Sequence, residues 1–401
     1  MKKLILAALI SISIVATGTA TADEIAPAYM QLLQEIVDIN SDTRNPEGLA
    51  QMRELLIPHF ETLGLKVTRH KLAEGRELLS FGTPGAEPQI LLLGHLDTVF
   101  PKAGAFRQLT RQGDRLTGPG VIDMKGGVVL MLNVLAQLKD AGQLGKIRVL
   151  LNDDEEIGSP HSKRSLRELA QGIPYGLVFE PGLEDGAVVR TQSGVRWIKL
   201  TTTGKAAHAG LEPENGINAC VDLAHKVTKA AALAQPQKGL TINPGVMEGG
   251  TKPNVVCEKA SVTIDVRFRD LPDWLGVSEL MEKIRGQSDV YNKKLQQGAS
   301  TELTQIAEMP PLPESDTHVL VQQAEAVARA LGQPFQARGV GYGSDANHLA
   351  GTSMQLLVGL GPYGGGMHSD KEYMLLSSYR DRLALVTGLV DKLLRADKGT
   401  P

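Results

Sequence analysis

The strongest constraint on the fold is an apolar run that ends in glycine and a His-x-Asp pair. Residues 90–93 (Ile-Leu-Leu-Leu) lack the polar alternation of a half-exposed strand, so they predict a strand buried on both faces, as in a parallel sheet covered by helices. Gly94 ends the run, and His95 and Asp97 follow. Side chains two apart on extended chain point the same way, so the carboxylate can hold one ring nitrogen while the other binds a metal. The spacing alone does not establish a metal site, because histidine also titrates, packs and caps helices.

The size and charge of the chain narrow the class of protein. At 401 residues the chain is long for one core, and two domains are expected. A hydrophobic content of 42% with 22% charged residues is typical of a soluble globular protein. The net charge of −3 gives no electrostatic reason to expect nucleic acid or an anionic membrane as a partner.

The N-terminus has the pattern of a secretory leader. Lys2 and Lys3 precede an apolar run over 4–16, and Ala20-Thr21-Ala22 offers a small-residue cleavage site. We therefore expect a signal peptide over 1–22, an exported protein in the periplasm or medium, and no membrane association after cleavage. The alternative is an uncleaved anchor.

The chain has two cysteines, Cys220 and Cys257. Cys220 falls on the apolar face of an expected helix, whereas Cys257 has the opposite parity to the apolar side chains of an expected strand over 255–268. The two thiols are then expected to face different ways and to remain free, even in an oxidising compartment, unless a bulge shifts the register.

The order of expected elements divides the chain. Helices alternate with strands up to residue 193 and again after the proline-rich stretch 310–313, and the order over 194–308 is the β-α-β-β-α-β of a ferredoxin-like unit. The prediction is an α/β fold. Residues 23–193 and 309–401 form a mostly parallel sheet with helices on both faces, and 194–308 form an inserted ferredoxin-like domain.

Acidic residues and histidines collect at the expected carboxyl ends of the strands, where open α/β sheets bind ligands. Crowded carboxylates raise one another's pKa unless cations neutralise them, and mixed histidine and carboxylate ligands suit zinc, with manganese or cobalt as alternatives. A solvated acidic rim with two packing histidines is the other interpretation. The glycines over 118–127 match no phosphate-binding motif and predict close backbone packing beside a site. The residues at this edge are His95, Asp97, Asp123, Glu155, Glu156, Glu180 and His368.

Several motifs occur in the order of one known family. The chain resembles the dinuclear-zinc metallopeptidase and aminoacylase family over essentially the whole mature length, most closely its exported glutamate carboxypeptidases. This resemblance implies a zinc-peptidase-like catalytic domain and a dimerisation role for the inserted domain. The motifs lie at 94–99, 118–127, 154–159, 179–181, 204–210 and 368–370.

The resemblance also implies roles for the acidic edge. It implies two Zn²⁺ per subunit, with Co²⁺ or Mn²⁺ as alternatives, and a cis peptide after the bridging aspartate. Glu155 would be the general base on a metal-bridging water, and Asp97 would orient a ligating histidine. The implied ligands are His95 and Glu180 for one metal, Glu156 and His368 for the other, and Asp123 between them.

Residues of the inserted domain are implied to complete the site. His208 would reach the partner subunit and stabilise the oxyanion, which implies a homodimer. Arg267 and Asn254 would hold the free carboxylate of a small-molecule or peptide substrate. The alternatives are a packing histidine, a surface arginine and a turn asparagine. His348, close to a glycine-rich loop, is a further candidate for substrate contact.

The expected function is that of an exported zinc exopeptidase that hydrolyses the amide before the C-terminal amino acid of N-acyl or folate-like conjugates. Glutamate is the expected C-terminal residue. An N-acyl-amino-acid deacylase of the acetylornithine or succinyl-diaminopimelate type is the close alternative. A periplasmic binding protein without catalysis is the alternative from another class, and the presence of Glu155 with a full ligand set argues against it. All of these metal-site interpretations require His368 to lie within reach of Asp123.

Overall fold

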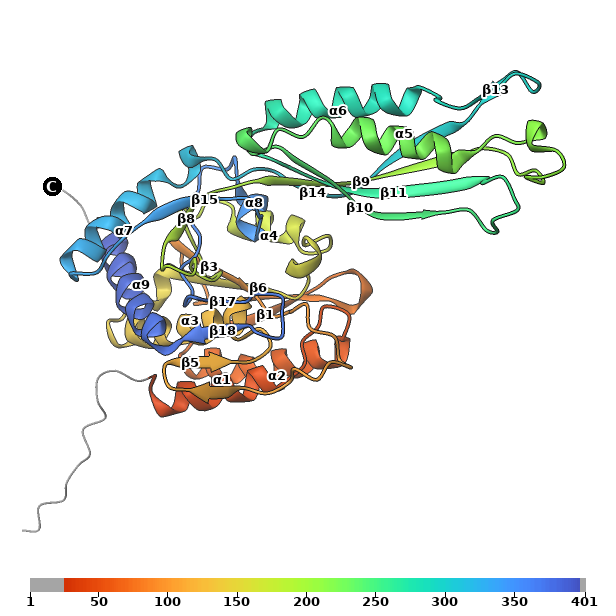
Figure 1. The fold of residues 1–401 in the computed structure, drawn as a ribbon. Coiled ribbons are helices and arrows are strands. Elements are labelled where there is room, and N and C mark those ends of the chain that lie inside the picture. The colour runs from red at the N-terminus through yellow and green to blue at the C-terminus, as the bar shows by residue number, and fades with distance from the viewer. Residues whose placement is uncertain (1–24, 397–401) are drawn as a thin grey trace, which may run out of the picture.

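A six-stranded sheet forms the centre of the body in the computed structural model, which describes residues 25–396 (Figure 1). The predicted signal peptide, 1–22, lies outside the described residues. β3 runs parallel to β6 and β7, and β16 runs parallel to β7, whereas β1 and β2 form an antiparallel edge. The order across the sheet is β1 (Lys66–Lys71), β2 (Glu77–Gly82), β6 (Ile147–Asn152), β3 (Ile90–His95), β7 (Tyr175–Val178) and β16 (Gln355–Leu357).

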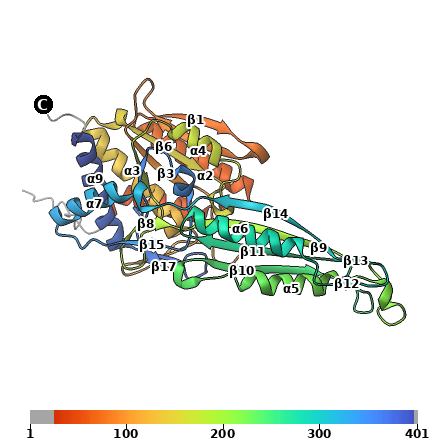
Figure 2. The same ribbon diagram turned by 90° about the horizontal axis from the view of Figure 1, so that it is seen from above.

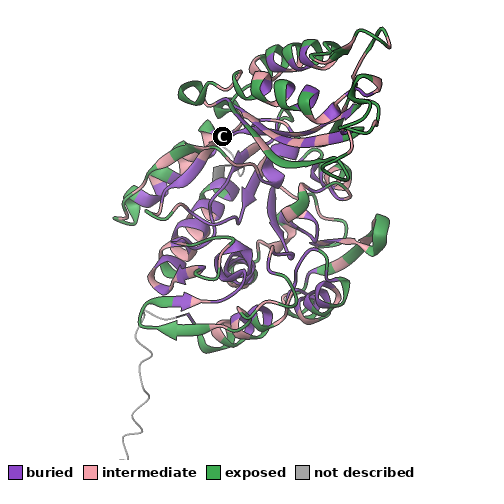
Figure 3. Cartoon of the chain, turned by 45° about the vertical axis from the view of Figure 1, so that its right-hand side comes forward, coloured by how far each residue is buried: buried purple, intermediate pink, exposed green. Residues whose placement is uncertain are grey.

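β3 is buried on both faces, as predicted. Every residue of β3 is buried, with Ile90 and Leu92 in one hydrophobic core and Leu91 and Leu93 in another. Figure 3 shows the buried residues gathered around this sheet. The first core includes residues of α1 (Pro27–Asp38), α2 (Pro46–Thr62), α3 (Gly126–Asp140), α7 (His318–Ala330) and α9 (Leu376–Ala396), and the second includes α4 (Lys163–Ala170) and α8 (Asp345–Leu349).

α3 and the turn before it, Val121–Asp140, are long and apolar enough to cross a membrane, but 83% of the apolar window is buried inside the protein. This is therefore a core helix. Gly127, in its first turn, lies so close to β7 that a Cβ would overlap the carbonyl oxygen of Phe179. The predicted role of these glycines, close backbone packing beside the strand ends, is confirmed at this position.

A second, four-stranded sheet with two helices extends from the body, and we call residues 194–309 the projecting unit (Figures 1 and 2). Its strands are all antiparallel and the order β10-β11-β9-β14 is that of a ferredoxin-like sheet. A short hairpin, β12 and β13, precedes the last strand. The bounds are β9 (Gly194–Thr203), α5 (Ala219–Ala231), β10 (Thr241–Gly249), β11 (Lys259–Phe268), α6 (Leu271–Gly286), β12 (Tyr291–Asn292), β13 (Gln297–Gly298) and β14 (Ser300–Met309).

The chain enters and leaves the projecting unit at neighbouring points. The N–H of Gln192 donates to the carbonyl of Leu312 at 3.1 Å, and the N–H of Leu312 donates back at 3.0 Å. Beside these hydrogen bonds, β8 (Val188–Gln192) pairs in parallel with β15 (Ala337–Val340). The two connections are therefore held together, and we call the junction at Gln192 and Leu312 the hinge.

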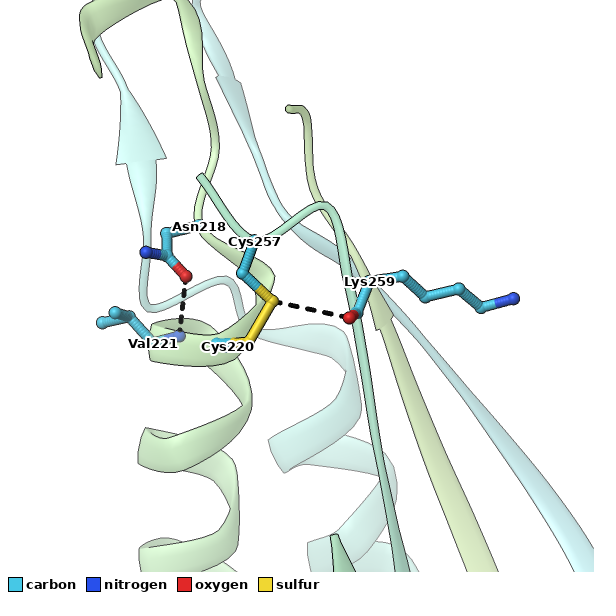
Figure 4. Close-up of a disulfide and its surroundings, with 5 residues drawn as sticks. All are labelled: Asn218, Cys220, Val221, Cys257 and Lys259. Carbon is cyan, nitrogen blue, oxygen red and sulfur yellow. Dashed lines mark hydrogen bonds between the residues drawn. A yellow bond between two sulfur atoms is a disulfide. The ribbon is translucent and has the colours of Figure 1, made fainter. Parts of the chain in front are cut away.

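The prediction of free cysteines was wrong. Cys220 and Cys257 form a disulfide, with their Cα atoms 5.7 Å apart (Figure 4). The parity argument failed because β11 begins only at Lys259, so Cys257 lies in the preceding loop, where strand alternation does not apply. The bridge ties the first turn of α5 to this loop and packs against Gly249 at the end of β10.

A small antiparallel sheet was not predicted, because its strands are too short to show a period of two. Its central pairing, β5 with β18, brings the chain after His368 beside the chain before the turn that carries Asp123. Its strands, in sheet order, are β17 (Gly364–Gly365), β18 (Tyr373–Leu375), β5 (Arg115–Thr117) and β4 (Thr110–Gln112).

Candidate metal centre

The ends of separate elements converge at one edge of the central sheet. His95 is the last residue of β3, Asp123 lies in the turn before α3, and Glu180 lies just after β7. Glu155 and Glu156 begin the short turn Glu155–Ile157 that follows β6. His368 comes from the loop between β17 and β18.

Asp123 lies between the two histidines. Its Oδ1 is 3.2 Å from Nε2 of His95, and its Oδ2 is 3.1 Å from Nε2 of His368. Each histidine has a further carboxylate nearby, since Nε2 of His95 is 3.6 Å from Glu180 and Nε2 of His368 is 3.4 Å from Glu156. One carboxylate oxygen per imidazole is the arrangement of a group that can bridge two cations.

Burial and mutual repulsion perturb the acids strongly. Burial raises the pKa of Glu156 to about 7 and that of Glu180 to about 8, and neighbouring carboxylates add to both shifts. Burial first, and the charge of Glu180 second, raise the pKa of Glu155 well above its usual value. The buried carboxylates therefore repel one another, and a cation bound among them would relieve this repulsion.

The histidines are perturbed in the opposite sense. Hydrogen bonds to Asp123 first, and to Glu156, raise the pKa of His368 to about 10. Burial would lower the pKa of His95, but the carboxylates of Glu180 and Asp123 outweigh it and raise that pKa well above the usual value. In the metal-free protein, the protonated rings of His95 and His368 therefore donate to the carboxylates, and divalent cations would replace these protons on binding.

The donor set fits divalent metal ions. Ligand atoms of His95, Asp123 and Glu156 lie within 4.8 Å of one another, and so do those of His95, Glu155 and Glu180. Sites that combine neutral imidazole and carboxylate oxygen suit zinc, and they also accept cobalt or manganese. The peptide bond Asp123–Met124 is cis, as predicted.

Asp97 joins the histidine to the acidic turn. Nδ1 of His95 lies 3.0 Å from the backbone carbonyl oxygen of Asp97 and 3.4 Å from its Oδ1, so the backbone and the side chain of Asp97 both lie beside this ring nitrogen. The same carboxylate accepts the backbone N–H of Glu155 at 3.2 Å and of Glu156 at 3.1 Å, and the hydroxyl of Thr43 at 2.8 Å. One fully buried carboxylate therefore holds a ligand candidate and the backbone of both glutamates.

Two supporting carboxylates were missed in the sequence. Glu372 accepts the backbone N–H groups of Ile122 at 3.0 Å and Asp123 at 3.3 Å, and so holds the turn that carries the bridging candidate. Asp345, at the start of α8, accepts from the hydroxyl of Ser159, just after the acidic turn. The only sequence signal for Glu372 is its place four residues after His368, and Asp345 has none beyond the glycine-rich loop before it.

Arg267 lies on the wall of the site, whereas two other predicted residues do not. It lines two overlapping cavities of about 330 and 380 Å³ that also expose Glu155, Glu156 and His368. The cavities also expose Tyr342, which the sequence analysis missed. The Arg267 guanidinium donates to Asp265 through Nε and Nη2 and to the carbonyl of Gly341 through Nη1, so three of its five N–H groups are used.

His208 and Asn254 are exposed on the projecting unit. The backbone N–H of Ala209, beside His208, donates to the carbonyl of Asn254 at 3.0 Å, so the two loops lie together. No hydrogen bond or ion pair within residues 25–396 joins either side chain to the acidic cluster of the same chain.

His348 is buried in α8, and its Nε2 lies 3.3 Å from the carbonyl of Gly158. It does not line either cavity at the cluster. The structure therefore gives His348 a packing position behind the acidic turn and does not support the predicted substrate contact.

Comparisons with known proteins agree with this geometry. The sequence profile of Peptidase family M20/M25/M40 matches residues 91–392. The chain is 30% identical to Carboxypeptidase G2 of Pseudomonas sp. (strain RS-16), covering 92% of this chain and 90% of that protein. Acetylornithine deacetylase of Proteus mirabilis is 22% identical over 93% of this chain and 98% of its own. The crystal structure of a tripeptidase from Staphylococcus aureus superposes with a TM-score of 0.77 at 21% identity, covering 93% of this chain and all (100%) of that one. By the profile match over residues 91–392 and the 30% identity to Carboxypeptidase G2, the chain belongs to Peptidase family M20/M25/M40.

Proposed function

We propose that this hydrolase is an exported two-zinc exopeptidase that cleaves the amide bond before a C-terminal amino acid in N-acyl or folate-like conjugates. Glutamate is the proposed preferred C-terminal residue. The observation that carries the proposal is Asp123, whose two oxygens lie within 3.2 Å of two different imidazoles. The similarity to Carboxypeptidase G2 supports the choice of reaction.

The proposed ligand assignment follows the distances. His95 and Glu180 would hold one cation, His368 and Glu156 the other, and Asp123 would contact both. When bound, the cations would supply Lewis acidity that polarises the scissile carbonyl and acidifies water. Asp97 would keep His95 in the required ring orientation and tautomer.

Glu155 is the proposed general base. It lines the same cavities as Glu156 and His368, and its raised pKa suits a group that takes a proton from water and returns it to the leaving amine. Its backbone is fixed through Asp97, so the carboxylate is presented from a rigid turn.

Arg267 is the proposed anchor for the substrate carboxylate. Asp265 fixes the guanidinium, two of the N–H groups remain unused, and the side chain lines the same cavity as the metal ligands. An anchor at this wall would leave the scissile amide on the side of the acidic cluster.

Glu155→Gln tests the proposal. The variant keeps shape and removes the base, so we expect kcat to fall by about 10²- to 10⁴-fold with zinc content unchanged at two per subunit. Metal content would be measured by atomic emission and activity with folate, benzoyl-glutamate and several dipeptides. Glu184→Gln, a carboxylate outside the cluster, is the matched control. Loss of zinc from the Glu155 variant would instead make this residue a ligand and refute the role of base.

An N-acyl-amino-acid deacylase is the second candidate, supported by the full-length similarity to acetylornithine deacetylase. It needs the same metal ligands and the same arginine and differs in the acyl group that it accepts. Adding acetylornithine and acetyl-glutamate to the substrate panel separates the two, because a deacylase should prefer the small acetyl group, whereas the proposed carboxypeptidase should prefer benzoyl-glutamate or folate over acetyl-glutamate.

Export and dimerisation belong to the same proposal. The leader pattern supports export, and so does the Cys220–Cys257 disulfide, which suits an oxidising compartment. The exposed position of His208 supports the proposed reach into a partner subunit. A dimer by light scattering, with loss of kcat in His208→Ala, is the expected result; a fully active monomer would refute it.

A further inference from the structure

A cavity of about 800 Å³ lies beside the hinge, and it is larger than either cavity at the acidic cluster, at about 330 and 380 Å³. Its walls come from both parts of the molecule. Thr241, Arg267 and Arg269 belong to the projecting unit, and Arg190, Glu314 and Gly341 belong to the body. Its volume is in the range of small-molecule sites and far exceeds that of a single ion.

The charged lining of this cavity is predominantly basic. Three arginines and one carboxylate, that of Glu314, line it; Arg267 is already paired with Asp265 at 2.9 Å, so Arg269 carries the unpaired positive charge. Glu314 pairs with Arg190 at 3.4 Å, and the Nε of Arg190 is buried without a hydrogen-bond partner. The unpaired charge of Arg269 and the two unused N–H groups of Arg267 favour an anion in the cavity.

Arg269 is placed by local backbone structure. Gly239 has a φ of +79°, and a Cβ at this position would overlap the Nε of Arg269, so the glycine makes room for the arginine. Within residues 25–396, no hydrogen bond or ion pair engages the Arg269 side chain. Its donors remain available to a ligand.

We propose that this hinge cavity is a binding site for a small polycarboxylate, an anion with at least two carboxylates that contact guanidinium groups from both walls. Planar guanidinium forks match carboxylates in pairs of parallel hydrogen bonds. A single oxyanion would leave most of the volume and at least one arginine unused. Because the walls belong to different units, the bound anion would brace the hinge. The inference rests on this cavity alone and does not require the proposed function.

Calorimetric titration of the zinc-loaded protein with propane-1,2,3-tricarboxylate tests the site. We expect one anion per chain and a Kd that weakens about tenfold or more in Arg269→Gln and in Arg190→Gln. Arg269→Gln removes an exposed side chain without partners, so its fold should be intact. Arg164→Gln, an exposed arginine on α4, is the matched control and should bind as the parent does.

Other outcomes overturn the proposal. Binding that is unchanged in both variants and is lost when zinc is removed would place the anion on the metals. Absence of binding up to about 10 mM, or equal binding of the uncharged triamide of the same acid, would exclude a polycarboxylate site.

Discussion

Breaking the Cys220–Cys257 bridge should destabilise the projecting unit by a predictable amount. The two cysteines are 37 residues apart in sequence. In the chain-entropy treatment, a loop of this length restricts the unfolded chain enough to stabilise the folded state by about 4 kcal/mol. The bridge also fixes the loop before β11 against the start of α5. The decrease in the free energy of unfolding should therefore appear in this unit rather than in the central sheet.

Urea unfolding of the oxidised protein, the protein reduced with a phosphine, and Cys220→Ala/Cys257→Ala measures this effect. Reduction should lower the free energy of unfolding of the projecting unit by about 4 kcal/mol, and the reductant should not shift the double variant at all. Trp197 and Trp274 lie in this unit and report its unfolding by fluorescence. Equal stability before and after reduction, to within about 0.5 kcal/mol, would refute the reasoning.

Three further predictions concern the body. Burial lowers the pKa of His348 to about 4, so between pH 6.5 and 4 the unfolded chain takes up a proton at this residue that the folded chain does not. His348 should therefore cost the metal-free protein about 3 kcal/mol of stability over this window, measured by urea unfolding as the difference between the losses of the parent and of His348→Asn. Equal losses would contradict this assignment. Gly127→Ala should lower stability by about 1–3 kcal/mol in thermal unfolding, because the new methyl overlaps the carbonyl of Phe179; an unchanged Tm would show that α3 can shift freely. Thr43→Val removes one donor to Asp97 and should lower kcat about fivefold with zinc content intact, whereas loss of zinc would give Thr43 a role in metal retention.

The parts of the fold that the sequence could predict are those with local periodicity. The apolar run of β3 is long enough to indicate burial on both faces, and the strands and helices over 194–309 alternate clearly. The strands of the small sheet have two or three residues each, too few to show alternation. Cys257 shows the same limit, since the error came from placing the start of β11 a few residues too early.

The candidate site was predictable where side chains follow strands directly. His95 ends β3, and Glu156 and Glu180 follow β6 and β7 within four residues, so the parallel sheet brings them to one edge. Glu372 could not be found in this way, because it contacts the backbone of Ile122 from 250 residues away in sequence. Such contacts depend on loop paths that no periodic pattern specifies.

The reciprocal hydrogen bonds between Gln192 and Leu312 have a consequence for how this protein can be changed. The segment between these two residues leaves the body and returns to it at the same place, so the two ends of the body chain lie side by side. We expect that a segment of different length could be grafted at this junction with the order of the central strands unchanged, since the ends that it must join are already adjacent. Because Arg267 reaches the cavity of the acidic cluster from this segment, such a graft would replace one wall of the site while β3 and β7, which lead to His95 and Glu180, keep their places.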